Sequence, residues 1–115
     1  MVEDTEDNRQ IVRDLIATTE YELIEAADGV AGVTAAAAQK PDLILMDIQL
    51  PVMDGYEATR HIKSNPALRH IPIIAVTSYA LSGDEAKALA AGCDGYVTKP
   101  FSPRQLLAKI REFLS

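Results

Sequence analysis

Short apolar runs alternate along the chain with segments in which apolar residues recur at helical spacing. The runs with the length of β-strands cover residues 23–26, 43–46, 73–76 and 95–98. The second and third lack polar alternation, which is typical of strands covered on both faces of a sheet. Helical spacing appears around residues 11–16, 30–37, 56–62, 86–90 and 106–114. This alternation predicts βαβ units around a parallel sheet.

The first strand of this sheet is expected to be short. Only Met1 and Val2 precede Glu3, whereas a strand usually contains about five residues. The spacing favours a strand that ends at Val2 and Glu3. Either the sequence starts late, or the strand is weakened and another chain covers its missing half.

The composition indicates one acidic globular domain, expected to span residues 1–115 with no output domain. Apolar residues make up 48% of the chain and suffice for one core. The net charge of −6 disfavours nucleic acid and anionic lipid as partners. The apolar runs fall far short of the ~20 residues of a membrane helix. The lone Cys93 and the acidic start suggest neither an oxidising compartment nor a signal peptide, so we expect a cytoplasmic location.

Charged and hydroxyl side chains gather where the expected strands end. Glu3 and Asp4 follow the first strand, Asp47 the third, Thr77 the fourth and Lys99 the fifth. Functional groups of open parallel sheets lie beyond the carboxyl ends of the strands, so these residues should share one edge. Neighbouring carboxylates repel one another, and Mg²⁺ with oxygen ligands removes that repulsion. The pattern therefore predicts a site for a metal ion and a phosphoryl group.

Asp47 is the candidate nucleophile, because it follows the most buried run, residues 43–46. A carboxylate beside Mg²⁺ can attack phosphorus and form an aspartyl phosphate. In such a transfer, Lys99 would pair with one phosphoryl oxygen and the Thr77 hydroxyl would donate a hydrogen bond to another.

The chain resembles the receiver domain of two-component response regulators over essentially its whole length. The resemblance rests on Val2-Glu3-Asp4, on Asp47 followed by Leu50-Pro51-Val52-Met53-Asp54-Gly55, on Thr77 and on Lys99-Pro100-Phe101. It implies a stand-alone, chemotaxis-regulator-like receiver with a flavodoxin-like, doubly wound (βα)5 fold and a parallel five-stranded sheet of order 2-1-3-4-5. It also implies phosphorylation of Asp47 by a sensor histidine kinase or a histidine phosphotransfer protein.

The same resemblance implies a set of metal ligands. Asp4, Asp47 and the backbone carbonyl of Gln49 would bind Mg²⁺, and Glu3 would act mainly through a metal-bound water. The chain would then catalyse only its own phosphorylation and dephosphorylation, and would not be a metabolic enzyme.

A switch is also implied by the resemblance. The Thr77 hydroxyl would move toward the phosphoryl group while the ring of Tyr96 turns inward, and the Lys99–Pro100 peptide bond would be cis. Gln49 and Tyr79 lie at positions that tune the phosphoryl lifetime. A downstream protein would dock on the surface of the fourth helix, the fifth strand and the fifth helix. The resemblance also allows the chain to form a homodimer.

Two other functions remain open from the sequence. A Mg²⁺-dependent phosphatase or transferase of the haloacid-dehalogenase type would need a second carboxylate two residues after its nucleophile, where this chain has Gln49. A phosphotransfer intermediate in a relay would differ from the switch only in where the phosphoryl group goes.

Several other residues are set aside. His61 and His70 lack partners at metal-ligand spacing and are expected to be solvated, and Cys93 is expected to pack in a turn. No glycine-rich phosphate loop follows the first strand, and Glu6-Asp7-Asn8 would repel a nucleotide phosphate.

Overall fold

The structure is a computed structural model that describes residues 1–48, 50, 53–77, 84–98 and 102–114. In chain order, the elements within these ranges are α1 (Glu6–Ile16), α2 (Gly29–Gln39), β1 (Ile44–Asp47), α3 (Gly55–Ser64), β2 (Ile73–Thr77), α4 (Asp84–Ala91), β3 (Gly95–Thr98) and α5 (Pro103–Leu114). The alternation of strands and helices from β1 onward confirms the predicted βαβ organisation.

The sheet is parallel, with β1, β2 and β3 side by side in that order. Val2 extends it beyond β1 through parallel bridges to Met46 on one side and Ala26 on the other. The Val2 amide donates to the Leu45 carbonyl at 2.8 Å, and the Glu3 amide donates to the Ala26 carbonyl at 2.9 Å. The spatial order of the segments is therefore the expected 2-1-3-4-5, with a very short first member.

The predicted strand over residues 23–26 is wrong in extent. Of this segment, only Ala26 forms a bridge, and no strand is present there. The cause lies in its neighbour: Val2 alone bridges to it, so the residues before Ala26 have no strand to pair with. The Met1 ammonium group donates to the Ile24 carbonyl at 2.6 Å, which holds the segment at this edge.

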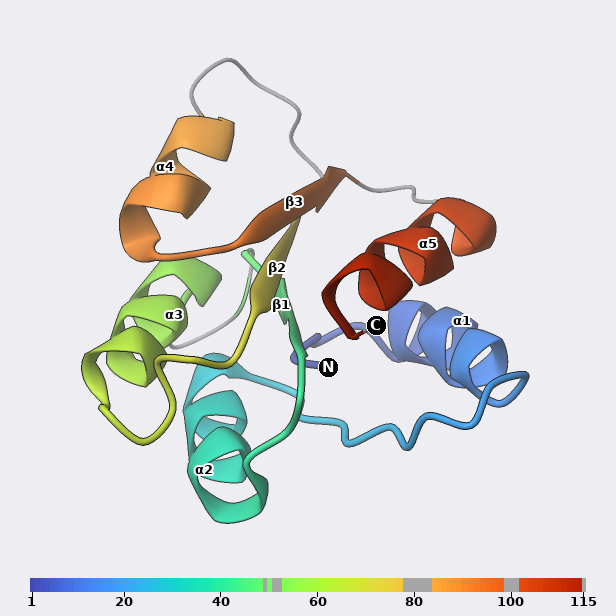
Figure 1. Ribbon diagram of the computed structural model, residues 1–115, viewed down its shortest axis with the longest axis horizontal. Coiled ribbons are helices and arrows are strands. Elements are labelled where there is room, and N and C mark those ends of the chain that lie inside the picture. Colours follow the sequence, from blue (N-terminus) through green and yellow to red (C-terminus); the bar gives the residue numbers. More distant parts are fainter. Residues whose placement is uncertain (49, 51–52, 78–83, 99–101, 115) are drawn as a thin grey trace.

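Two apolar layers lie on opposite faces of the sheet. Helices α2, α3 and α4 cover one face, and α1 and α5 cover the other (Figure 1). Alternating side chains divide β2 between the layers, with Ile73 and Ala75 facing α2–α4 while Ile74 and Val76 face α1 and α5. All residues of β1 and β2 are buried, as their unbroken apolar runs predicted.

A cavity of about 470 Å³ lies at the amino-terminal side of the sheet, under Met1 and Val2. Its walls include residues 20–24 and 39–45, the two segments that flank the short first strand.

Within the described ranges, no helix combines the length and hydropathy needed to cross a bilayer.

Candidate functional site

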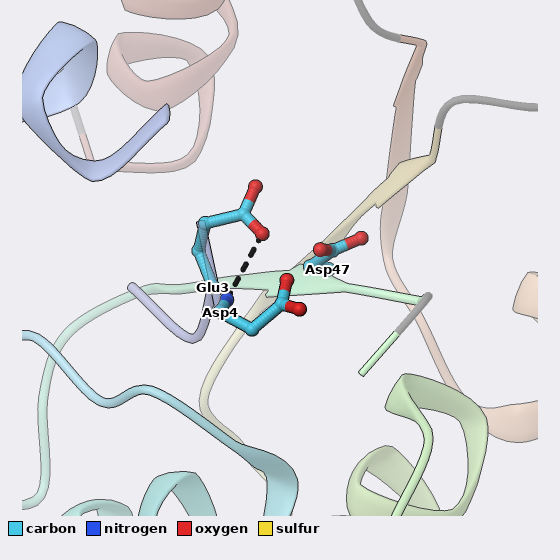
Figure 2. A group of neighbouring side chains, drawn as sticks. All are labelled: Glu3, Asp4 and Asp47. Atoms are coloured by element: carbon cyan, nitrogen blue, oxygen red, sulfur yellow. Dashed lines mark hydrogen bonds between the residues drawn. The ribbon is translucent and has the colours of Figure 1, made fainter. Parts of the chain in front are cut away.

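Three carboxylates meet at the carboxyl end of β1. One oxygen each of Glu3, Asp4 and Asp47 can be chosen so that all lie within 4.8 Å of one another. Figure 2 shows Glu3 and Asp4 on the chain that leaves the short first strand, with Asp47 beside them on β1. The prediction that Glu3, Asp4 and Asp47 lie together at the carboxyl ends of the strands is therefore confirmed.

The carboxylate of Glu3 is fully buried and held by the chain itself. Its Oε2 accepts a hydrogen bond from the Asp4 amide at 3.0 Å (Figure 2). Its Oε1 accepts one from the side-chain amide of Asn8, also at 3.0 Å. Both oxygens therefore have a fixed donor, and the orientation of the carboxylate is set by neighbouring residues.

Asp47 is the last residue of β1, and only 2% of it is exposed. Its amide donates to the Val2 carbonyl at 3.0 Å, which ties its backbone to the first strand. After it, the Ile48 amide donates to the Val76 carbonyl and the Ile48 carbonyl accepts from the Gly55 amide, each at 3.0 Å. These bonds fix the backbone on both sides of Asp47.

Asp4, in contrast, is exposed to solvent. The cluster therefore combines two buried carboxylates, of which Glu3 is oriented by its donors, with one that an incoming hydrated ion can reach. Carboxylate oxygens are the ligands Mg²⁺ prefers, and this ion binds through a few carboxylates while keeping several waters. The donor set of Glu3, Asp4 and Asp47 fits Mg²⁺.

Thr77 and Tyr96 lie on the same face of the sheet. Thr77 ends β2 and is buried, and strand alternation places it on the face of Ile73 and Ala75. Tyr96 is half-buried, pairs in register with Ala75 and packs against the layer under α2–α4. The two residues of the expected switch pair thus share one side of neighbouring strands.

Several predicted site residues lie outside the described part of the chain. They are Gln49, Tyr79, Lys99 and Pro100. The carbonyl ligand, the phosphoryl-pairing ammonium and the cis peptide bond remain predictions.

An ion-pair network joins α1 to the segment around residue 25. The Arg13 guanidinium lies 2.7 Å from Glu25 and 3.2 Å from Glu6, and Arg9 lies 2.6 Å from Glu6. The hydrogen bond from Arg13 lowers the pKa of Glu25, and hydrogen bonds from Arg9 and Arg13 lower the pKa of Glu6. Arg9 also donates to the Glu3 carbonyl at 2.6 Å, so the network reaches the acidic site.

Sequence reasoning missed Asn8 and Arg9. The stretch Glu6-Asp7-Asn8 was interpreted only as unfavourable for nucleotides, whereas Asn8 and Arg9 both donate to Glu3. The available signal was their position in the first turns of α1, five and six residues after Glu3.

The residues set aside from the sequence behave as expected. His61 and His70 are exposed. Cys93 is buried, its Sγ lies 3.7 Å from the Thr59 hydroxyl, and burial raises the pKa of its thiol. Among the described residues, the only grouping of His, Cys, Asp and Glu side chains suited to a metal is the one formed by Glu3, Asp4 and Asp47.

Comparison with known families places this geometry in context. The family model described as the response regulator receiver domain matches residues 1–111. The polar-differentiation response regulator DivK of Brucella anthropi is 44% identical over 114 residues, which cover 99% of this chain and 93% of that protein. DivK of Brucella abortus matches with the same identity and coverage.

Solved structures give the same picture. The receiver domain of a sensor histidine kinase from Pseudomonas aeruginosa superposes with a TM-score of 0.91 at 39% identity, covering 98% of this chain and 93% of that one. That structure has a magnesium ion coordinated in its active site cleft. The chemotaxis protein CheY4 of Vibrio cholerae superposes with a TM-score of 0.91 at 28% identity, covering 97% of this chain and 93% of that one.

Proposed function

This chain belongs to the family of response regulator receiver domains, the phosphorylation-dependent switches of two-component signalling, and we propose that Asp47 is the residue that accepts the phosphoryl group. One observation carries the proposal: Asp47 lies at the end of β1 with Glu3 and Asp4, and their carboxylate oxygens approach within 4.8 Å. A buried carboxylate with a fixed backbone, beside a cation site, is the arrangement that an aspartyl phosphate requires.

In the proposed reaction, an oxygen of Asp47 attacks the phosphorus of a phosphohistidine on a kinase or phosphotransfer protein. The phosphorus–nitrogen bond breaks and the histidine leaves. When bound, Mg²⁺ would neutralise negative charge on the transferring phosphoryl group. Asp4, Asp47 and the Gln49 carbonyl would hold this ion, with Glu3 acting mainly through a bound water.

The other site residues would stabilise the phosphoryl group. The Lys99 ammonium would pair with one of its oxygens, and the Thr77 hydroxyl would donate a hydrogen bond to another. The chain would catalyse only the formation and hydrolysis of its own aspartyl phosphate. Gln49 and Tyr79 would influence how fast water reaches it.

The new phosphoryl group adds nearly two negative charges and strong hydrogen-bond acceptors, which can shift a bistable packing arrangement. Thr77 would respond first, and Tyr96 would follow because it lies on the same face of the adjacent strand. The output would then appear on the surface of α4, β3 and α5, where Leu89 of α4 is 56% exposed. We propose this surface as the docking site of a downstream protein or a second copy of the chain, in the cytoplasm.

The test is phosphorylation by acetyl phosphate, followed by intact-protein mass spectrometry. The expected result is the addition of one phosphoryl group in the presence of Mg²⁺, and none after chelation or in Asp47→Asn. The matched control is Asp42→Asn, because Asp42 is exposed and precedes β1 at the opposite end of the strand. Labelling that persists in Asp47→Asn would defeat the proposal.

A phosphatase would behave differently in the same preparation. It would turn over an external phosphomonoester such as p-nitrophenyl phosphate many times per molecule. The switch predicts no sustained turnover of this substrate.

A further inference from the structure

Asn8 occupies the third position of α1, and its side chain turns back to the acidic site. Its Nδ2 donates to Glu3 Oε1 at 3.0 Å. Helix α1 follows the short first strand directly, so its first turn lies beside the three carboxylates. None of the three carboxylates of the metal site comes from α1 itself.

We infer that Asn8 is a positioning residue of the cation site, which orients the Glu3 carboxylate before any ion binds. The inference rests on the proposed function, since it assigns the acidic cluster to Mg²⁺. It adds a residue whose role is neither to bind the ion nor to touch the phosphoryl group.

Within the described part of the chain, Glu3 accepts hydrogen bonds from three donors. Arg9 fixes its backbone by donating to its carbonyl at 2.6 Å. The Asp4 amide fixes Oε2, but that donor belongs to the adjacent residue and moves with the same backbone. Asn8 is the donor from α1 to the carboxylate, so it connects the side-chain orientation to the helix.

Burial makes this connection effective. Glu3 is fully buried, so its carboxylate depends on donors supplied by the protein. A carboxylate offers about four acceptor sites, so Glu3 can take part in several hydrogen bonds at once, including one from a metal-bound water. Outer partners of this kind orient metal ligands and raise the affinity of the site.

The inference predicts weaker Mg²⁺ binding in Asn8→Ala. A hydrogen bond of about 0.5–1.5 kcal/mol corresponds to an increase of about two- to twelvefold in the Kd for Mg²⁺. Alanine has the highest helix propensity, so the substitution does not weaken α1 through propensity. The ion-free protein should also lose stability, because the buried Glu3 carboxylate loses a donor. The Mg²⁺ titration is made on the folded protein and measures the loss of affinity separately.

The measurement is an NMR titration of the amide resonances with MgCl₂, combined with urea unfolding of the ion-free protein. The control is Gln10→Ala, because Gln10 is on the same helix and its side chain donates to Asp14 at 2.7 Å and accepts from Arg13 at 2.6 Å, whereas Asn8 donates to Glu3 itself. Asn8→Gln keeps an amide donor on a longer side chain and should give an intermediate Kd.

The outcomes separate the inference from the function on which it rests. If the unsubstituted protein does not bind Mg²⁺, the proposed function fails and the inference fails with it. If it binds Mg²⁺ and Asn8→Ala binds equally well, or Gln10→Ala weakens binding as much, the inference alone is overturned. Weaker binding in Asn8→Ala alone, with Asn8→Gln in between, supports it.

Discussion

Gly55 determines how closely α3 approaches the end of β1. A Cβ atom built at this position would lie 2.7 Å from Ile48 Cα and closer still to the Asp47 carbonyl oxygen. Its amide already donates to the Ile48 carbonyl at 3.0 Å. The absence of a side chain therefore lets the start of α3 close the loop that follows Asp47.

We predict that Gly55→Ala destabilises the protein by about 1–3 kcal/mol, because the new methyl group meets backbone atoms that cannot rotate away. It should also displace Asp47 and slow phosphorylation by acetyl phosphate. Urea unfolding measures the first effect, and the rate of labelling measures the second.

Gly95→Ala is the matched control for this substitution. A Cβ there would lie 3.2 Å from the ring of Phe113 and 3.3 Å from Cε of Lys109, both of which are ends of side chains that can adjust. A smaller loss of stability and an unchanged labelling rate are expected. An equal effect of both substitutions on labelling would contradict the role given to Gly55.

At the residue scale, the sequence located the acidic site through strand ends. Glu3, Asp4 and Asp47 could be predicted because parallel strands bring their carboxyl ends to one edge. Asn8 could not, since a polar residue on a helix reveals its partner only when the direction of that helix is known. The distinction is between residues placed by topology and residues placed by packing.

At the scale of elements, the first strand is represented by the bridges of Val2. Val2 bridges both neighbours, and the Met1 ammonium group is drawn into the same edge, where it donates to the Ile24 carbonyl. Burial lowers the pKa of this amino group to about 6, partly opposed by the charge of Glu25. The folded protein therefore releases this proton at a lower pH than the unfolded chain does.

This shift predicts a pH-dependent stability. Below about pH 6 the amino group is charged in both states, and folding carries the cost of burying the charge. As the pH rises from about 6 to 8, the folded protein loses the proton first, so the free energy of unfolding should increase by about 2–3 kcal/mol.

The measurement is urea unfolding across this pH range, with the α-amino group free or acetylated. Acetylation removes the titrating group but keeps one N–H for the Ile24 carbonyl. The difference in pH dependence between the two forms isolates Met1. Parallel pH profiles would contradict a buried amino terminus.

The strands β1, β2 and β3 were predicted to within one residue at each end. Strand β3 has the expected bounds, β2 ends one residue later than expected, and β1 both begins and ends one residue later. Residues 23–26 were mispredicted because strand formation depends on a partner, and the neighbouring strand is too short to provide one. The pattern of apolar residues in a segment indicates its preference for strand conformation, but a strand forms only where a neighbouring strand is available to pair with it.

At the scale of the whole molecule, the residues that hold the cation site and the residues of the proposed switch lie on opposite faces of the sheet. Tyr96 packs against the apolar layer under α2–α4, and strand alternation places Thr77 on the same face of the sheet. The opposite face carries α1, whose first turn holds Glu3. Cation positioning and the proposed conformational response thus lie on opposite sides of the same strands and meet at Asp47.

The central claim is that the phosphoryl group is carried by Asp47, and chemical mapping of that bond tests it most directly. Borohydride reduces an aspartyl phosphate to homoserine, which peptide mass spectrometry locates in the chain. After treatment with acetyl phosphate and Mg²⁺, we predict homoserine at position 47 and at no other aspartate, and none when Mg²⁺ is chelated. Homoserine at another position, or a phosphoryl group that survives reduction on a hydroxyl side chain, would contradict the claim.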